Sequence, residues 1–135
     1  MTEPRTYALF ISHGWKFDES FKDLCSVLGE IEDFRWRNHS IAEPAEDAGD
    51  IPRLRERIRQ QIKPAQAVLI LAPTYKARSD WVGFEITCAK QLNKPIIAVK
   101  GPEDDDLPPR LSVAADEVVA WDGDEIVAAI RKRVR

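Results

Sequence analysis

Several features that mark specialised protein classes are scarce in this chain. It has only two cysteines, Cys25 and Cys88, and two histidines, and the cysteines do not form a C-x-x-C pair. A disulfide scaffold, a zinc site and a thiol redox motif are therefore all disfavoured. Both cysteines fall in helical patterns, and we expect them to be buried thiols in a chain without a metal site.

Long apolar runs are also lacking. Nowhere do about 18 uncharged apolar residues stand together, and the first residues lack a basic region followed by an apolar stretch. The formal net charge of -3 does not indicate binding to a polyanion such as nucleic acid. We therefore expect a cytoplasmic protein that binds neither membrane nor nucleic acid.

What is present is the composition of an ordinary globular protein. The 135 residues are 44% hydrophobic and 32% charged, and the length suits one hydrophobic core. We predict a single domain over residues 1–135. Neither a G-x-G-x-x-G nor a G-x-x-x-x-G-K-[ST] motif occurs, so the usual dinucleotide and P-loop binding modes are disfavoured.

Short apolar segments alternate with amphipathic ones along the chain. The apolar segments predict strands over Thr6–Ser12, Phe34–Arg37, Ala67–Ala72, Pro95–Val99 and Glu117–Trp121. The amphipathic segments predict helices over Phe17–Glu30, Ile51–Lys63, Asp80–Leu92 and Asp124–Val134. This alternation predicts an α/β fold with one doubly wound, five-stranded parallel sheet in the flavodoxin-like order 2-1-3-4-5, with helices on both faces.

In such a sheet, ligands bind at the carboxyl ends of the strands, near the point where the strand order reverses. That rule selects residues after the first three strands: Ser12 and His13, then Asn38, His39 and Ser40, then Pro73–Tyr75. The acidic stretch Asn38–Asp50 is too long for a tight turn and is a candidate site element. Turn residues bonded to the backbone remain an alternative for each of these polar side chains.

Glu85 interrupts the apolar face of its own helix. At about 100° per residue, Val82, Cys88 and Ala89 help to centre an apolar arc on it. A buried, unpaired carboxylate is costly, so Glu85 either faces a polar cleft or bonds a backbone amide or a lysine at the edge of the core. Trp81, one turn earlier, can line the same cavity or act as a core or interface aromatic.

Six segments resemble, in order, the TIR-like family that includes the TIR-like proteins of Thoeris antiphage systems: FISHGWKFDESF, FRWRNHSI, AVLILAPTY, SDWVGFEI, NKPIIAV and EVVAW. The resemblance covers roughly Tyr7 to Arg131. Phe-Ile-Ser is similar to the TIR strand signature. Trp81 with Glu85 in DWVGFEI is similar to the W-x-x-x-E helix motif of TIR domains that cleave NAD.

The resemblance implies an NAD glycohydrolase or cyclase that makes an ADP-ribose-derived signal in bacterial antiphage defence. In that family the motif's Glu contacts the ribose beside the nicotinamide, a role that falls here on Glu85. The implied substrate neighbours are Ser12, His13, Asn38, His39 and Trp81. NAD is the substrate, with no other cofactor implied. The implied partners are further copies or other TIR-like chains, and an effector that reads the signal.

The chain also departs from the family pattern. Many NAD-cleaving TIR domains follow Phe-Ile-Ser with an aromatic and basic residues, whereas this chain has His13, Gly14 and Trp15, with Lys16 one place later. A second function therefore stays open, a catalytically silent TIR-like adaptor that mediates TIR–TIR assembly. A third is a nucleoside deoxyribosyltransferase-like enzyme, which shares the layered fold and a glycosidic carboxylate.

Overall fold

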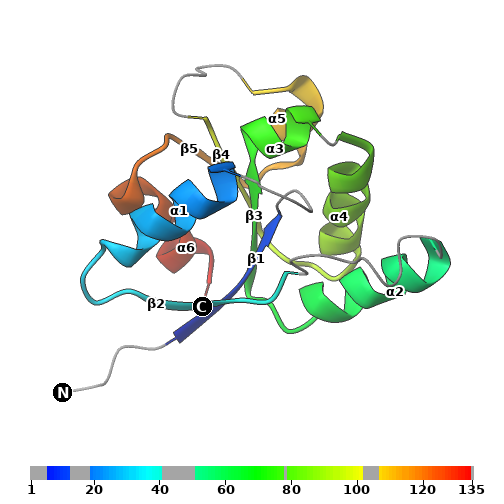
Figure 1. Cartoon of the computed structure of the whole chain (residues 1–135), viewed down its shortest axis with the longest axis horizontal. Coiled ribbons are helices and arrows are strands. Elements are labelled where there is room, and N and C mark those ends of the chain that lie inside the picture. Colours follow the sequence, from blue (N-terminus) through cyan, green and yellow to red (C-terminus); the bar gives the residue numbers. More distant parts are fainter. Residues whose placement is uncertain (1–5, 13–18, 41–50, 78, 102–106, 135) are drawn as a thin grey trace.

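Five parallel strands form the centre of the protein. The computed structural model describes residues 6–12, 19–40, 51–77, 79–101 and 107–134. The strands are β1 (Thr6–Ser12), β2 (Arg35–Asn38), β3 (Ala67–Leu71), β4 (Ile96–Val99) and β5 (Glu117–Val119). They lie in the order β2-β1-β3-β4-β5 (Figure 1), which confirms the predicted parallel sheet and its order.

Helices cover both faces of this sheet. They are α1 (Glu19–Gly29), α2 (Ile51–Ile62), α3 (Ala72–Ala77), α4 (Ser79–Gln91), α5 (Pro109–Ala114) and α6 (Gly123–Arg133). Figure 1 shows α1 and α6 on one side of the sheet and α2 and α4 on the other. The protein is therefore a three-layer α/β structure, as the alternation of segments predicts.

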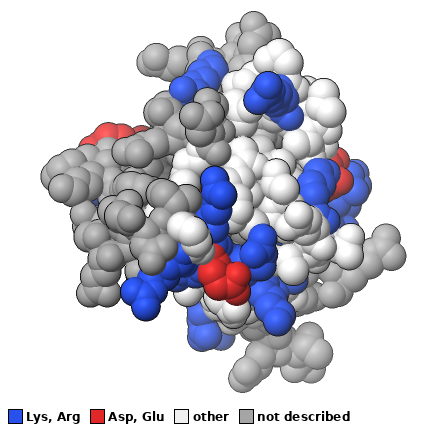
Figure 2. Space-filling model, turned by 90° about the vertical axis from the view of Figure 1, so that its right-hand side faces the viewer, with Lys and Arg blue, Asp and Glu red and all other residues white. Residues whose placement is uncertain are grey.

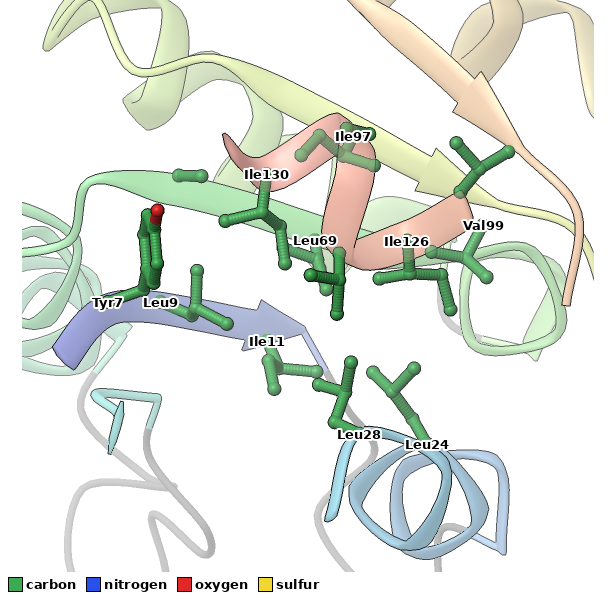
Figure 3. Close-up of a cluster of buried hydrophobic side chains, with 14 of the residues drawn as sticks. Tyr7, Leu9, Ile11, Leu24, Leu28, Leu69, Ile97, Val99, Ile126 and Ile130 are labelled. Carbon is green, nitrogen blue, oxygen red and sulfur yellow. The ribbon is translucent and has the colours of Figure 1, made fainter. Parts of the chain in front are cut away.

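The sheet separates two hydrophobic cores. Successive side chains of a strand point to opposite faces, so Leu69 joins the core under α1 and α6, while Ile70 joins the core under α2 and α4. Figure 3 shows the first core, where side chains from both helices meet the sheet: Leu24, Leu28, Ile126 and Ile130 against Leu9, Ile11 and Leu69. All five residues of β3 are buried, as expected for a strand covered on both faces.

Two helices were not predicted. The candidate residues Pro73–Tyr75 belong to α3, because β3 runs directly into this helix, and Thr74 and Tyr75 are buried. Pro109 begins α5 in the same manner. Proline is well tolerated in the first turn of a helix, where its missing N–H has no intrahelical partner to lose.

The outer surface over α2 and α4 combines basic and uncharged side chains. Figure 2, which views the molecule from this side, shows Lys and Arg around an area without charge. Arg59 pairs with Glu56 at 3.3 Å within α2, and the guanidinium of Arg55 lies 5.4 Å from the centre of the Phe84 ring on α4. The latter contact is a cation–π interaction that joins the two helices.

Candidate active site

A buried hydrogen bond joins the end of β1 to the middle of α4. The hydroxyl of Ser12 donates to Oε1 of Glu85 over 2.6 Å. Ser12 is 0% exposed and Glu85 is 4% exposed. The distance is at the short end for an O–H···O bond and is typical of a hydroxyl bonded to a carboxyl group.

Strand periodicity explains the direction of the Ser12 side chain. Ser12 is the last residue of β1 and pairs with Ile70 of β3. It lies two residues after Phe10, which belongs to the core under α2 and α4. Residues two apart on a strand share a face, so the Ser12 hydroxyl also points into the layer that contains α4.

Helix periodicity places Glu85 on the opposite side of the same contact. Val82 is 1% exposed, and Cys88 and Ala89 are 0% exposed, so the face of α4 that carries Glu85 is the one packed against the sheet. The prediction that Glu85 lies among core residues is confirmed. Its partner is neither a backbone amide nor a lysine, the two partners expected for a structural glutamate, but a serine hydroxyl.

Burial changes the acidity of this carboxyl group. Loss of water around Glu85 raises its pKa from 4.5 to about 8, and the hydrogen bond from Ser12 opposes that rise. The carboxyl is therefore mostly protonated at neutral pH in the free protein. Groups with strongly shifted pKa values are concentrated at functional sites, which makes Glu85 the strongest catalytic candidate among the described residues.

Asn38 lies at the end of β2, the strand next to β1, and its side-chain oxygen accepts hydrogen bonds from the backbone. Oδ1 accepts from the Ile11 amide at 3.1 Å and from the Ser40 amide at 3.0 Å. The β1–β2 pairing ends at Leu9 and Asn38, so the carboxamide provides an acceptor for Ile11 beyond the last backbone pair. Asn38 thus ties the start of its loop to β1, and contact between its oxygen and a substrate stays a prediction.

The two residues after Asn38 stay at the same edge of the sheet. The His39 amide donates to the carbonyl of Leu9 at 2.8 Å, and its side chain is half-buried. Among the described residues, the buried Oγ of Ser40 has no hydrogen-bond partner. A substrate role for His39 stays a prediction. His13 and residues 41–50 of the predicted loop lie outside the described residues.

Trp81 belongs to an aromatic pair on α4. Its ring centre lies 6.0 Å from that of Phe84, at a tilt of 38°. Both side chains are half-buried and pack against the core under α2 and α4. This packing fits the core or interface alternative for Trp81, and its role as a wall of the substrate site stays a prediction.

A pocket of about 390 Å³ lies at the other edge of the sheet. Its walls include Pro95 and Asp116, which precede β4 and β5, so it opens at the amino ends of the strands. The remaining wall residues are Lys90, Asn93, Lys94 and Arg133. None of the predicted site residues belongs to it, and it is separate from the Ser12–Glu85 pair.

Two further features are absent from the described part of the chain. Its His, Cys, Asp and Glu side chains form no group of three or more that could hold a metal ion. Each helix within the same residues is too short or too polar to traverse a bilayer.

One solved structure helps to place the fold. A 3-dehydroquinate dehydratase-like protein from Bifidobacterium longum superposes on this chain with a TM-score of 0.50, over 95% of this chain and 94% of that chain. The two sequences are 12% identical, so the likeness concerns the fold and does not extend to the dehydratase-like site. No curated protein matches the sequence.

A known family matches most of the chain. The family described as Thoeris protein ThsB, TIR-like domain, matches residues 10–106, well over half of the 135 residues of the chain. The matched span contains Ser12, Asn38 and Glu85. The chain therefore belongs to the family of TIR-like domains of the Thoeris protein ThsB.

Proposed function

We propose that this chain is an NAD glycohydrolase or cyclase that breaks the bond between nicotinamide and ribose and produces an ADP-ribose-derived signal in antiphage defence. The observation that carries the proposal is the Glu85 carboxyl group, buried beside the carboxyl end of β1 and held by Ser12. Ligands of parallel α/β sheets bind at that edge. Glu85 is also the Glu of the W-x-x-x-E motif.

Cleavage of the bond between nicotinamide and ribose requires little from the protein beyond one carboxylate. When the bond between C1′ and the ring nitrogen breaks, its electron pair stays on nitrogen and cancels the pyridinium charge, so nicotinamide leaves without a general acid. The ribose then carries oxocarbenium charge, which a carboxylate stabilises. Water adds at C1′ and loses a proton to give ADP-ribose, or an internal nucleophile adds to give a cyclic product.

The substrate itself favours the ionised form of Glu85 that this role needs. Without substrate, burial holds the pKa of Glu85 near 8, so the neutral carboxyl predominates at neutral pH. NAD carries a positive charge on its nicotinamide ring, and a cation close to a carboxyl group lowers its pKa. Binding of NAD therefore promotes loss of the proton from Glu85.

At 4% exposure Glu85 is too covered to touch a ribose, so the described conformation corresponds to a resting state under this proposal. We propose that association with further copies or other TIR-like chains uncovers the carboxyl and completes the site. A separate effector would then read the product. Activity that depends on protein concentration is the expected sign of such an arrangement.

A silent adaptor is the second candidate, and the same burial favours it. A glutamate that is covered and satisfied by a serine hydroxyl can be purely structural. The adaptor function predicts assembly of TIR-like chains without turnover of NAD. The adaptor function leaves unexplained why a core position carries Glu85 instead of an apolar residue.

The test is to incubate concentrated protein with NAD and to identify nicotinamide, ADP-ribose and its cyclic isomers by mass spectrometry. The Glu85→Gln variant is run beside Glu30→Gln, which changes an exposed glutamate far along the chain from the site. Nicotinamide from wild type and Glu30→Gln, but not from Glu85→Gln, supports the proposal. Base exchange between nucleosides without NAD cleavage supports a deoxyribosyltransferase, and assembly without any product supports the adaptor.

A further inference from the structure

We infer that Ser12 is a positioning residue, whose hydroxyl fixes the orientation of the Glu85 carboxyl group and makes no contact with substrate. This role rests on the proposed function of Glu85 as the catalytic carboxylate. It differs from the sequence-based prediction, which placed Ser12 in direct contact with NAD.

The Ser12 hydroxyl is enclosed and already bonded to Glu85. Ser12 has no exposed surface, whereas Glu85 keeps 4% of its own. The hydroxyl hydrogen is directed to Oε1 of Glu85 over 2.6 Å. Because this hydrogen is already engaged by Glu85, the proposed uncovering of the carboxyl group leaves the serine hydroxyl bonded to Glu85 and not to a substrate.

Both ends of the hydrogen bond are held by rigid elements. Ser12 pairs with Ile70 in the ladder between β1 and β3. The amide of the preceding Ile11 donates to Oδ1 of Asn38 at 3.1 Å. Glu85 lies on a helix whose neighbouring residues Val82 and Cys88 are 1% and 0% exposed. A carboxyl group held from both sides keeps one rotamer, and such preorganisation is what a charge-stabilising group requires.

The hydrogen bond also has an electrostatic consequence. A hydroxyl that donates to a carboxylate stabilises the ionised form, so Ser12 lowers the pKa of Glu85 while burial raises it. The Cys88 thiol on α4 interacts with Arg59 and Glu56 of α2 and with Glu85 itself. Within the described residues, burial and Ser12 are the causes of the Glu85 shift.

A direct titration tests the inference without any enzyme assay. The protein is labelled with ¹³C at the glutamate δ-carbons, and the Glu85 signal is assigned by its loss in Glu85→Gln. Removal of a hydrogen bond to a charged group costs about 1.5 to 3 kcal/mol, so Ser12→Ala should raise the Glu85 pKa by roughly 1 pH unit or more. Ser12→Thr, which keeps the hydroxyl, should titrate close to wild type, as should Ser26→Ala on the exposed face of α1.

The inference is wrong if Glu85 titrates in Ser12→Ala as it does in wild type. Should Ser12→Ala fail to fold, Ser12→Cys takes its place, because a thiol is a weaker donor and predicts a rise in the same direction. An unchanged titration in that variant overturns the inference equally.

Kinetics separate positioning from substrate contact. Ser12→Ala should lower kcat for NAD by roughly 10- to 100-fold with little change in KM, and should move the acidic limb of the kcat profile to higher pH. A rise in KM alone contradicts the positioning role. A shifted titration without NAD cleavage in any variant supports the Ser12–Glu85 coupling and counts against the proposed function, so the two failures are distinguishable.

Discussion

Glu85 lowers the stability of the fold to which it belongs. Its carboxyl group is 4% exposed in an otherwise apolar layer, and burial raises its pKa to about 8. The unfolded chain, with a pKa of 4.5 for this group, loses the proton at a lower pH than the folded chain does. The folded state therefore binds more protons than the unfolded state between these two values, and its stability falls as pH rises through that window.

Glu85→Gln should remove this pH dependence. Glutamine keeps an amide oxygen for the Ser12 hydroxyl but cannot ionise. Between pH 4.5 and about 8, wild type should lose up to roughly 1.4 kcal/mol of unfolding free energy per pH unit through this group, while the variant loses none of that contribution. Urea denaturation across this pH range measures the difference, and Glu30→Gln serves as the control that should parallel wild type.

Parallel profiles for wild type and Glu85→Gln would contradict the raised pKa. They would also remove the argument that substrate binding promotes ionisation. Higher stability of Glu85→Gln than of wild type at the alkaline end of the range would agree with the raised pKa.

The sequence predicts part of this site because helical periodicity is local. Glu85 stands out within one turn of Val82 and Cys88, and its burial follows from that pattern alone. Its partner does not, since Ser12 is 73 residues away and meets Glu85 only through the placement of α4 over β1. The hydrogen bonds that Asn38 accepts from two backbone amides could not be predicted from the sequence either, because they depend on where the β1–β2 ladder ends.

At the level of elements, α4 carries a glycine that its packing does not require. A Cβ atom placed on Gly83 would meet no atom within 4 Å. Glycine inside a helix costs about 0.5 to 1 kcal/mol relative to alanine, because more backbone freedom is lost on folding. Gly83→Ala should therefore raise the unfolding free energy by about that amount, as measured by urea denaturation.

Gly123, the first residue of α6, is the matched control. A Cβ atom there would lie 2.8 Å from Cδ1 of Ile31 and 3.1 Å from Cγ1 of Val27. Gly123→Ala should give no gain, or a loss, since these side chains must move to make room. Equal stabilisation by both substitutions would contradict this expectation, because the Ile31 and Val27 side chains would then move without loss of stability.

Elements with a strong hydrophobic pattern are the predictable ones. β1 has the predicted bounds, α2 ends one residue earlier than predicted, and α4 begins and ends one residue earlier. The prediction for β2 begins one residue early, at Phe34, whose ring stacks on Tyr7 with ring centres 5.3 Å apart. The short helices α3 and α5 were missed because their six residues are too few to show a periodicity, and because each has proline in its first turn.

For the molecule as a whole, β3 is the element that both cores share. Leu69 and Ile70 are adjacent and fully buried, one in each core. Substitution of either by alanine leaves a cavity and should cost about 2 to 5 kcal/mol. Because both cores pack on one sheet, both variants should lower the midpoint of the same single unfolding transition.

Circular dichroism and tryptophan fluorescence, followed in one denaturation series, check this expectation. Coincident curves for Leu69→Ala and Ile70→Ala indicate one cooperative unit. Separate transitions in either variant would mean that the two layers unfold independently, and the predicted single domain over residues 1–135 would be wrong.

The fold could be predicted from the order of its segments, but the activity cannot be concluded from the fold. Alternating strands and helices leave few topologies once crossovers are short and right-handed, which is why the strand order β2-β1-β3-β4-β5 was predictable. A dehydratase-like protein at 12% identity shares that fold. The chain belongs to the TIR-like family, and the proposed catalytic role of the buried Glu85 carboxyl is what an assay must now address.

The most direct measurement of the central claim is the initial rate of nicotinamide release from NAD at increasing protein concentration, for wild type, Glu85→Gln and Glu30→Gln. We predict release by wild type and Glu30→Gln that rises more steeply than the protein concentration, and a loss of at least about 100-fold in Glu85→Gln. Full turnover by folded Glu85→Gln would contradict the account, because the reaction would then proceed without the carboxylate on which it depends.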